Sequence, residues 1–173
     1  PGPSGFSADE LKTLWSGNAK VRKGIYDIVL KIWSGEERPE DLKVGSFTNL
    51  FKDGDSTDLN RWRGIVSCES ILQLVTMVVE LRFQRFWLPI YASKDQTGFR
   101  WLFGTRDGSF CLKRSIEMCR EAGIDSVLLC LDARKAFDRI CQASVTAIMT
   151  RFGIPRDVIE VLSWARTGSS VEM

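Results

Sequence analysis

The residue best suited to chemistry in this 173-residue chain is Asp132, within the segment LLCLDARKAFDRI at 128–140. It follows a run of apolar residues typical of a buried strand. A carboxylate at the carboxyl end of such a strand is a suitable oxygen ligand for a hard cation such as Mg²⁺. Aspartate at this position also suits a turn, where its side chain accepts from backbone N–H groups. The segment alone leaves both interpretations open.

The amino-acid composition limits the chemistry that is available. The chain has no histidine, which excludes Ser-His-Asp and Cys-His catalysis and histidine metal sites. Its five cysteines include no C-x-x-C pair, so we expect neither a disulfide framework nor a zinc site, and a reducing, intracellular compartment is favoured. No apolar run approaches the roughly 18 residues needed to cross a bilayer, so no membrane partner is expected.

Basic residues alternate with aromatic residues in three places. This pattern is typical of surfaces that contact a nucleic-acid backbone and stack its bases. Arginines that extend along amphipathic helices produce the same pattern, and composition alone favours that simpler interpretation. The residues concerned are Arg61 and Arg63 around Trp62, Arg82 and Arg85, and Arg100 and Arg106 around an aromatic loop.

The elements that must position these residues follow from periodicity and turn signals. Ser7 and Glu10 predict a capping box at the start of a helix that Gly17 ends. Segments 44–51 and 61–67 predict a hairpin with a long charged tip. The other expected elements are helices over 19–33, 107–122, 142–152 and from Pro155 as a first helical residue, a largely buried helix over 68–87, an irregular loop over 89–105 and a buried central strand over 124–132. This order indicates an α+β or mixed α/β domain.

Five segments, in order along the chain, share one further property. They are PGPSGFSADELK, LFKDGDSTDLNRWRGIVSCESILQLV, QTGFRWLFGTRD, LLCLDARKAFDRI and RFGIPRDVIEVL. Each resembles a motif of the reverse transcriptases of non-LTR (LINE-type) retrotransposons, and LLCLDARKAFDRI is similar to motif A of that family. The resemblance extends over essentially the whole chain.

This resemblance implies an α+β fold, with right-hand polymerase fingers plus a partial palm, that is, an incomplete reverse transcriptase domain. The expected parts are 1–43 as the N-terminal helical part of the fingers, 44–105 as the fingers hairpin, long helix and loop, and 106–173 as the partial palm with motif A. The chain departs from the family pattern in three places. Ser4 replaces an Asp, Gly64 replaces a Pro and so loosens a turn after Arg63, and WLF at 101–103 replaces a small, basic stretch.

The implied activity is that of an RNA-directed DNA polymerase, a nucleotidyltransferase that uses two Mg²⁺ ions, deoxynucleotide triphosphates, an RNA template and a DNA primer. Asp132 would be a catalytic metal ligand, joined by the backbone carbonyl of Ala133. Phe137 would be the gate beneath the incoming sugar. Lys52 and Arg63 would grip the triphosphate, although Lys52 in a turn is also simply solvated and Arg63 could pair with Asp53 or Asp55. Weaker template or nucleotide contacts are expected from Gln96, Arg100 and Arg106.

The sequence holds one of the several metal-binding carboxylates that the family uses. It stops before the Gly-rich motif and the Y-x-D-D turn, so we expect this chain to be inactive without the remainder of the polymerase chain, and its palm sheet to have an unpaired edge. Two alternatives remain open. One is a non-catalytic nucleic-acid-binding or inert remnant, and the other is an unrelated enzyme that needs only this length. An intracellular location, in the nucleus or the cytoplasm, is expected in each case.

Overall fold

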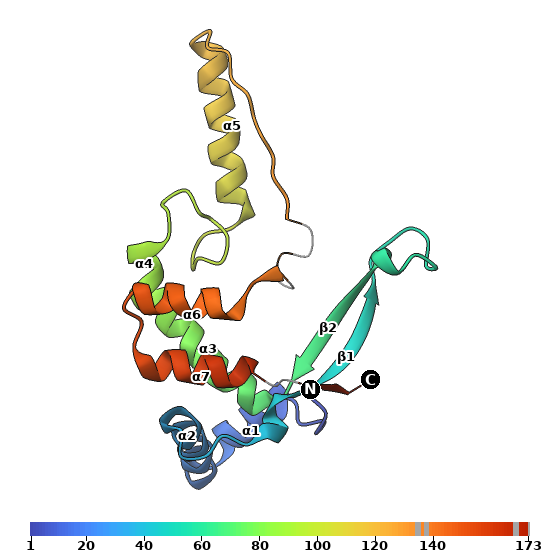
Figure 1. Cartoon of the computed structure of the whole chain (residues 1–173), viewed down its shortest axis with the longest axis vertical. Helices are drawn as coiled ribbons and strands as arrows, with labels where there is room; N and C mark the ends of the chain where they lie inside the picture. Colours follow the sequence, from blue (N-terminus) through green and yellow to red (C-terminus); the bar gives the residue numbers. More distant parts are fainter. Residues whose placement is uncertain (134–135, 137–138, 168–169, 173) are drawn as a thin grey trace. The chain divides into compact units, whose positions relative to one another are not determined.

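The computed structural model describes residues 1–133, 136, 139–167 and 170–172, and contains helices together with one small sheet (Figure 1). The chain divides into two units by its internal contacts. The first unit is Pro1–Glu80 with Gly153–Met173, and the second unit is Leu81–Phe152. These bounds differ from the division at residues 43 and 105 that the sequence suggests, which stays a prediction. Helix and sheet are both present, and the polymerase fold also stays a prediction.

The first unit begins with two helices that follow local sequence signals. Helix α1 covers Ala8–Gly17 and α2 covers Ala19–Ser34. The predicted capping box is confirmed, because the Ser7 hydroxyl accepts from the Glu10 N–H at 3.2 Å and the Ser7 N–H donates to the Glu10 carboxylate at 2.7 Å. The Ser7 backbone N–H, and after it the Ser7 hydroxyl at 2.8 Å, donate to the Glu10 carboxylate and hold the pKa of Glu10 below its ordinary value.

The opening segment is fixed against the start of α3, which covers Ser70–Arg82. Gly2 lies so close to it that an added Cβ would be 2.7 Å from the backbone nitrogen of Glu69. Gly5 donates its N–H to the Gly2 carbonyl at 3.0 Å. Its φ of 75° lies in the left-handed region, where a residue with a side chain would be strained. Ser4 donates both its N–H and its hydroxyl to the Glu69 carboxylate, at 2.8 and 2.6 Å. A serine therefore suits this position because it can donate to a carboxylate.

The sheet has the strand order β2-β1-β3. Strand β1 covers Val44–Phe51, as predicted, and pairs antiparallel with β2, Trp62–Cys68, to form the expected hairpin. The short strand β3, Ser170–Glu172, pairs parallel with the start of β1. Most residues of the two hairpin strands are exposed, so the hairpin is a ribbon with both faces accessible over most of its length.

The core of the first unit comes from three helices. Helix α7 covers Arg156–Arg166, with Pro155 as its N-cap, one position earlier than predicted, and it contacts α2. The indole N–H of Trp33 donates to Asp157 at 2.7 Å and links these two helices. The buried apolar residues of this unit are Ile25 and Ile32 of α2, Leu72, Val75 and Val79 of α3, Ile154 just before α7, and Val158, Val161 and Leu162 of α7.

The second unit has a much smaller core. It contains a π-helical turn over Phe83–Trp87, α4 over Leu88–Tyr91, α5 over Thr105–Glu121 and α6 over Gln142–Arg151. Among its described residues, Met149 of α6 is the one apolar side chain that is buried. In the described part of the whole chain, no helix has the length and apolar character needed to cross a membrane.

The prediction of one largely buried helix over 68–87 is wrong in its second half. The regular helix ends at Arg82, the next five residues form the π-helical turn, and Met77, Leu81 and Phe86 are exposed. An apolar circumference predicts burial only when other elements cover every side of the helix. The described residues cover only the side that carries Leu72, Val75 and Val79.

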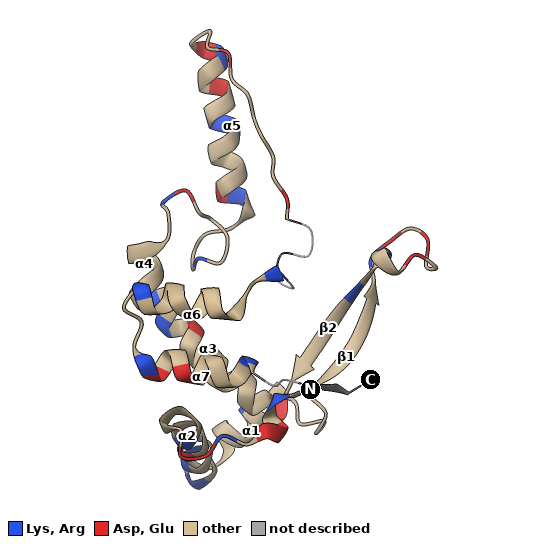
Figure 2. Cartoon of the chain, viewed as in Figure 1, with Lys and Arg blue, Asp and Glu red and all other residues tan. Residues whose placement is uncertain are grey.

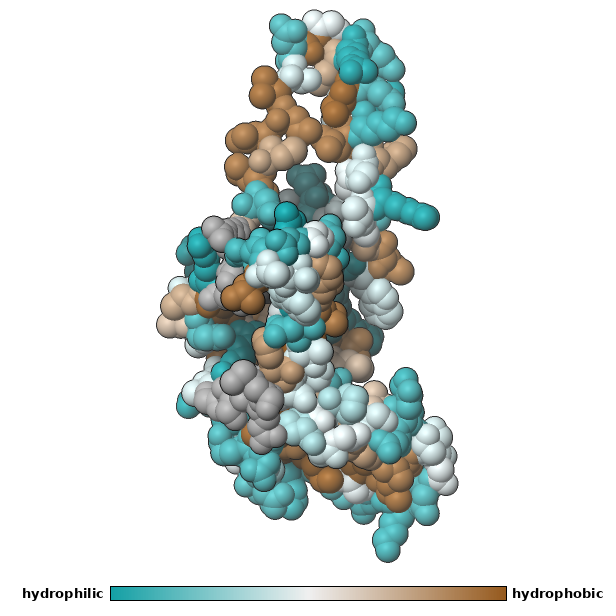
Figure 3. Space-filling model, turned by 90° about the vertical axis from the view of Figure 1, so that its right-hand side faces the viewer, coloured by the Kyte–Doolittle hydropathy of each residue, from teal (hydrophilic) through white to brown (hydrophobic). Residues whose placement is uncertain are grey.

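The predicted buried strand over 124–132 is also wrong. After α5 the chain turns at Gly123 and continues as extended chain without a strand partner among the described residues (Figure 1). Val127 is 97% exposed and Leu131 is 86% exposed. Figure 3 accordingly shows hydrophobic surface in the upper part of the view, at the height of α5 and this segment. The apolar run has the composition of a strand, but a strand forms only where a neighbour supplies hydrogen bonds.

Candidate functional site

Asp132 lies at the end of the exposed extended segment. Its side chain and Ala133 are both solvent-exposed. Within the described part of the chain, no group of three His, Cys, Asp or Glu residues is placed to hold a metal ion. Asp132 thus presents one carboxylate, which does not form a metal site without further ligands. Phe137, the expected gate residue, lies outside the described residues.

The hairpin register places the two expected triphosphate-binding cations on one face. Leu50 is directly opposite Arg63, and opposed residues point to the same face. Lys52 follows Leu50 by two positions, and its N–H donates to the Arg61 carbonyl at 2.9 Å, so the pairing continues to it. Lys52 and Arg63 are both exposed and are diagonal neighbours. This arrangement is suited to contacting one polyphosphate.

The tip of the hairpin is acidic, as Figure 2 shows. Asp53 lies 3.6 Å from the guanidinium of Arg61, and Asp58 lies 3.8 Å from it. Hydrogen bonds from Thr57 hold the pKa of Asp55 below its ordinary value. In the part of the chain that the structure describes, the ion pairs of the tip use Arg61 and none uses Arg63. Arg63 is thereby left available for a ligand.

The opposite face of the hairpin is aromatic. The rings of Phe51 and Trp62 are in contact, with centroids 5.2 Å apart. A Cβ added at Gly64 would lie 2.6 Å from the Phe47 ring. Gly64 is paired within β2 and does not lie in a turn, so the expectation that it loosens a turn after Arg63 is wrong. A glycine at this position instead makes room for the Phe47 ring.

Residues 93–104, which we call the aromatic loop, are fixed by one glutamine. Gln84, in the π-helical turn, donates its side-chain amide to the Phe99 carbonyl at 2.8 Å and accepts from the Trp101 N–H at 2.9 Å. Phe99 has a φ of 57° and Leu102 a φ of 68°, which is uncommon for bulky residues. The loop therefore has a definite backbone conformation, although its side chains are largely exposed.

The three polar residues expected to contact template or nucleotide have different surroundings. The guanidinium of Arg100 donates to the carbonyls of Ser93 and Gln96 at 3.1 and 3.3 Å and lies 4.5 Å from the centre of the Phe103 ring. Gln96 itself donates to a backbone carbonyl of the same loop. Arg106, in the first turn of α5, is exposed. Arg100 and Gln96 thus stabilise the loop, and their expected ligand contacts stay predictions.

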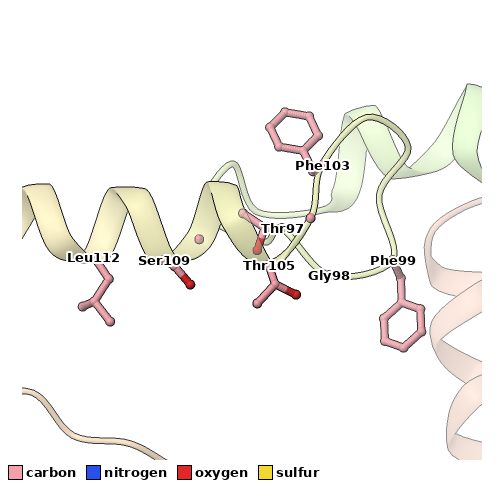
Figure 4. Close-up of a pocket in the computed structure, with 9 residues that line it drawn as sticks. Thr97, Gly98, Phe99, Phe103, Thr105, Ser109 and Leu112 are labelled. Carbon is pink, nitrogen blue, oxygen red and sulfur yellow. The ribbon is translucent and has the colours of Figure 1, made fainter.

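A hollow with a volume of about 470 Å³ lies between the aromatic loop and α5. Figure 4 shows the side chains of Thr105, Ser109 and Leu112 on the same side of the backbone as the Phe99 ring, whereas the Phe103 ring points the other way. The hollow combines hydroxyl groups, apolar surface and bare backbone. Its lining residues are Thr97, Gly98, Phe99, Phe103, Gly104, Thr105, Gly108, Ser109 and Leu112.

Comparison with known proteins indicates a retroelement-related protein. The chain is similar to the "Retrovirus-related Pol polyprotein from type-1 retrotransposable element R2" of Popillia japonica, with 28% identity over 107 residues. The match covers 62% of this chain and 15% of that polyprotein, so the chain spans a small part of its relative's length. No family model matches the chain, and no solved structure matches it significantly. The similarity supports a retrotransposon-related origin.

Two features of this region have no signal in the local sequence. Gln84 is fifteen and seventeen positions away from the loop residues that it holds. A glutamine within an apolar helical pattern gives no indication of such a contact. The left-handed conformations of Phe99 and Leu102 are equally unexpected, because neither residue type favours them. The exposed aromatic stretch itself was visible in the sequence as WLF in place of a small, basic segment.

Proposed function

We propose that this chain is part of a reverse transcriptase, the RNA-directed DNA polymerase of a non-LTR retrotransposon, with fingers and partial palm. The similarity to the R2 polyprotein over 107 residues is the observation that carries the proposal. The five collinear motifs support it, and so does the common face of Lys52 and Arg63 on the hairpin. The complete protein would extend a DNA primer on an RNA template inside the cell, in the nucleus or the cytoplasm.

The roles of the residues follow from the chemistry of phosphoryl transfer, which depends mainly on positioning and on charge neutralisation. Lys52 and Arg63 would neutralise the triphosphate and orient it, Arg63 through a bidentate contact. Asp132 and the Ala133 carbonyl would hold Mg²⁺, which neutralises phosphate charge when it is bound. Since the described residues offer one carboxylate there, further ligands must come from the remainder of the polymerase. Phe137 would contact the incoming sugar.

Primer extension by the complete polyprotein on an RNA template tests this proposal. Asp132→Asn removes the metal-binding charge with little change in volume, and we expect activity to fall by at least about 100-fold. Asp125→Asn is the matched control, because Asp125 is an exposed aspartate seven positions earlier. We expect the control to keep full activity. Equal activity of the two variants would show that Asp132 does not serve as a metal ligand.

A second candidate function is a non-catalytic nucleic-acid-binding protein or an inert remnant of such a polymerase. Its nucleic-acid-binding form needs no metal site, and within the described residues no group of three possible metal ligands is present. Binding of the 173-residue chain to an RNA–DNA hybrid, measured at increasing salt, distinguishes these outcomes. A binding protein loses affinity steeply as salt releases the phosphate contacts, whereas a remnant shows no binding at any salt concentration.

A further inference from the structure

The aromatic loop exposes an unusual amount of apolar surface. Phe99 is 80% exposed, Trp101 is 69% exposed and Leu102 is 90% exposed, in one run of the chain. Contiguous apolar surface of this kind marks an interaction site. Because Gln84 and Arg100 fix the loop backbone, the exposed rings are held in place before any ligand arrives. A ligand that binds such fixed rings loses less free energy to ordering than one that must order a mobile loop.

The hollow beside the loop adds polar groups of a particular kind. Thr97, Thr105 and Ser109 contribute hydroxyl groups, which can both donate and accept hydrogen bonds. The Phe99 ring lies on the same side of the backbone as Thr105 and Ser109 (Figure 4). Hydroxyl groups beside an aromatic face suit a flat, heteroaromatic ligand whose edge carries donors and acceptors.

The net charge of the second unit indicates the charge of the molecule that carries such a ligand. Residues 81–152 contain twelve Lys and Arg against seven Asp and Glu, a formal net charge of +5, whereas the rest of the chain carries −3. Lys94 in the aromatic loop and Arg106 beside it are both exposed. Figure 2 shows basic residues in the loop region and both basic and acidic residues along α5, where Lys113 and Arg114 pair with Glu117. An anionic polymer with planar aromatic groups complements this combination of charge and rings.

From these observations we propose that the aromatic loop binds a single-stranded segment of nucleic acid, with an unpaired base stacked on Trp101 or Phe99. The edge of a base stacked on Phe99 faces the hydroxyl groups of the hollow, and Lys94 and Arg106 contact neighbouring phosphates. The proposal rests on the proposed function for the kind of ligand, and it adds a base-stacking contact that residues 101–103 provide in this chain. A double-stranded ligand is not expected to bind here, because its bases are already stacked on one another.

Fluorescence anisotropy with the whole chain and a labelled oligoadenylate of about 12 nucleotides tests this contact. We expect Trp101→Ala and Phe99→Ala each to weaken binding by roughly 5- to 150-fold, the usual effect of removing a stacking ring. The matched control is Phe110→Ala, because Phe110 is 70% exposed on α5 and does not line the hollow. The control should bind as tightly as the unchanged chain. Circular dichroism confirms that each variant keeps its helices.

A strand of equal length that lacks its bases separates stacking from charge without any mutation. The proposal predicts that the unchanged chain binds this abasic strand about as weakly as Trp101→Ala binds oligoadenylate. If both strands bind equally well and the variants bind like the unchanged chain, stacking by the loop is overturned while nucleic-acid binding stands. If neither strand binds, the inference fails. It fails as well if Trp101→Ala abolishes only self-association of the chain, because the loop is then a protein-contact surface. The primer-extension assay tests the proposed function separately.

Discussion

The contact between Ser4 and Glu69 leads to a quantitative prediction about the opening segment. Glu69 is only 9% exposed, and both of its carboxylate oxygens accept from Ser4. The hydroxyl lies 2.6 Å from one of them. Aspartate, the usual residue at this position in the family that the opening resembles, would direct a second carboxylate at Glu69. We therefore expect Ser4→Asp to destabilise the first unit.

The loss in free energy of unfolding caused by Ser4→Asp has two contributions. Losing a hydrogen bond to a charged acceptor costs about 1.5–3 kcal/mol. Two unit charges about 4 Å apart repel by about 4 kcal/mol at the effective dielectric constant of a protein surface. Since Ser4 is itself exposed, solvent reduces the repulsion, and we take about half of that value. The replacement of Ser4 by Asp should therefore lower the free energy of unfolding by about 4 kcal/mol, and its replacement by Asn by about 2 kcal/mol.

Urea denaturation followed by circular dichroism measures these differences. Ser4→Asn is the matched control, because asparagine has the shape of aspartate without its charge. Repeating both substitutions in a Glu69→Gln background completes a double-mutant cycle. In that background we expect the free energies of unfolding of the Ser4→Asp and Ser4→Asn variants to differ by less than about 1 kcal/mol, since the charge of Glu69 is gone. An unchanged difference would show that repulsion from Glu69 is not its cause.

Two further predictions concern Gly64 and Cys141. Gly64→Ala should lower the free energy of unfolding by about 0.5–1.5 kcal/mol, because its Cβ would lie 2.6 Å from the outer edge of the Phe47 ring, which is 37% exposed and must turn away. Urea denaturation should show no such loss in a Phe47→Ala background. Hydrogen bonds from Ser144, and then from Ala143, lower the pKa of Cys141, so its thiolate forms at lower pH in the folded chain. The rate at which iodoacetamide labels Cys141, followed by mass spectrometry over a range of pH, should therefore reach half its maximum at lower pH in the folded chain than in the urea-unfolded chain. Equal midpoints in the two states would contradict this cause.

The elements that could be predicted from the sequence are those with local causes. The capping box at Ser7 needs only residues three positions apart, and it is present. Strand β1 follows from an apolar run bounded by turn residues, and its bounds match the prediction. The face shared by Lys52 and Arg63 follows from alternation once the register of the hairpin is known. In each of these cases, neighbours in the sequence determine the geometry.

The features that could not be predicted depend on distant partners. The run over 124–132 has the composition of a strand, but no residue near it in the sequence specifies a pairing strand. The serine at position 4 looks like a simple departure from a motif until Glu69, sixty-five positions away, is seen to accept from it. Gly64 is understood only through Phe47 on the neighbouring strand. Composition identifies such residues, and only tertiary contacts explain them.

The exposed segment 124–131 also has a consequence for biosynthesis. Residues 1–123 leave the ribosome before it does, and none of the described residues among them pairs with it. Its apolar side chains therefore stay exposed to water while the rest of the chain is synthesised. Chaperones and the same segment of other nascent chains compete for such exposed apolar surface. The yield of folded protein should then fall as the concentration of nascent chains rises.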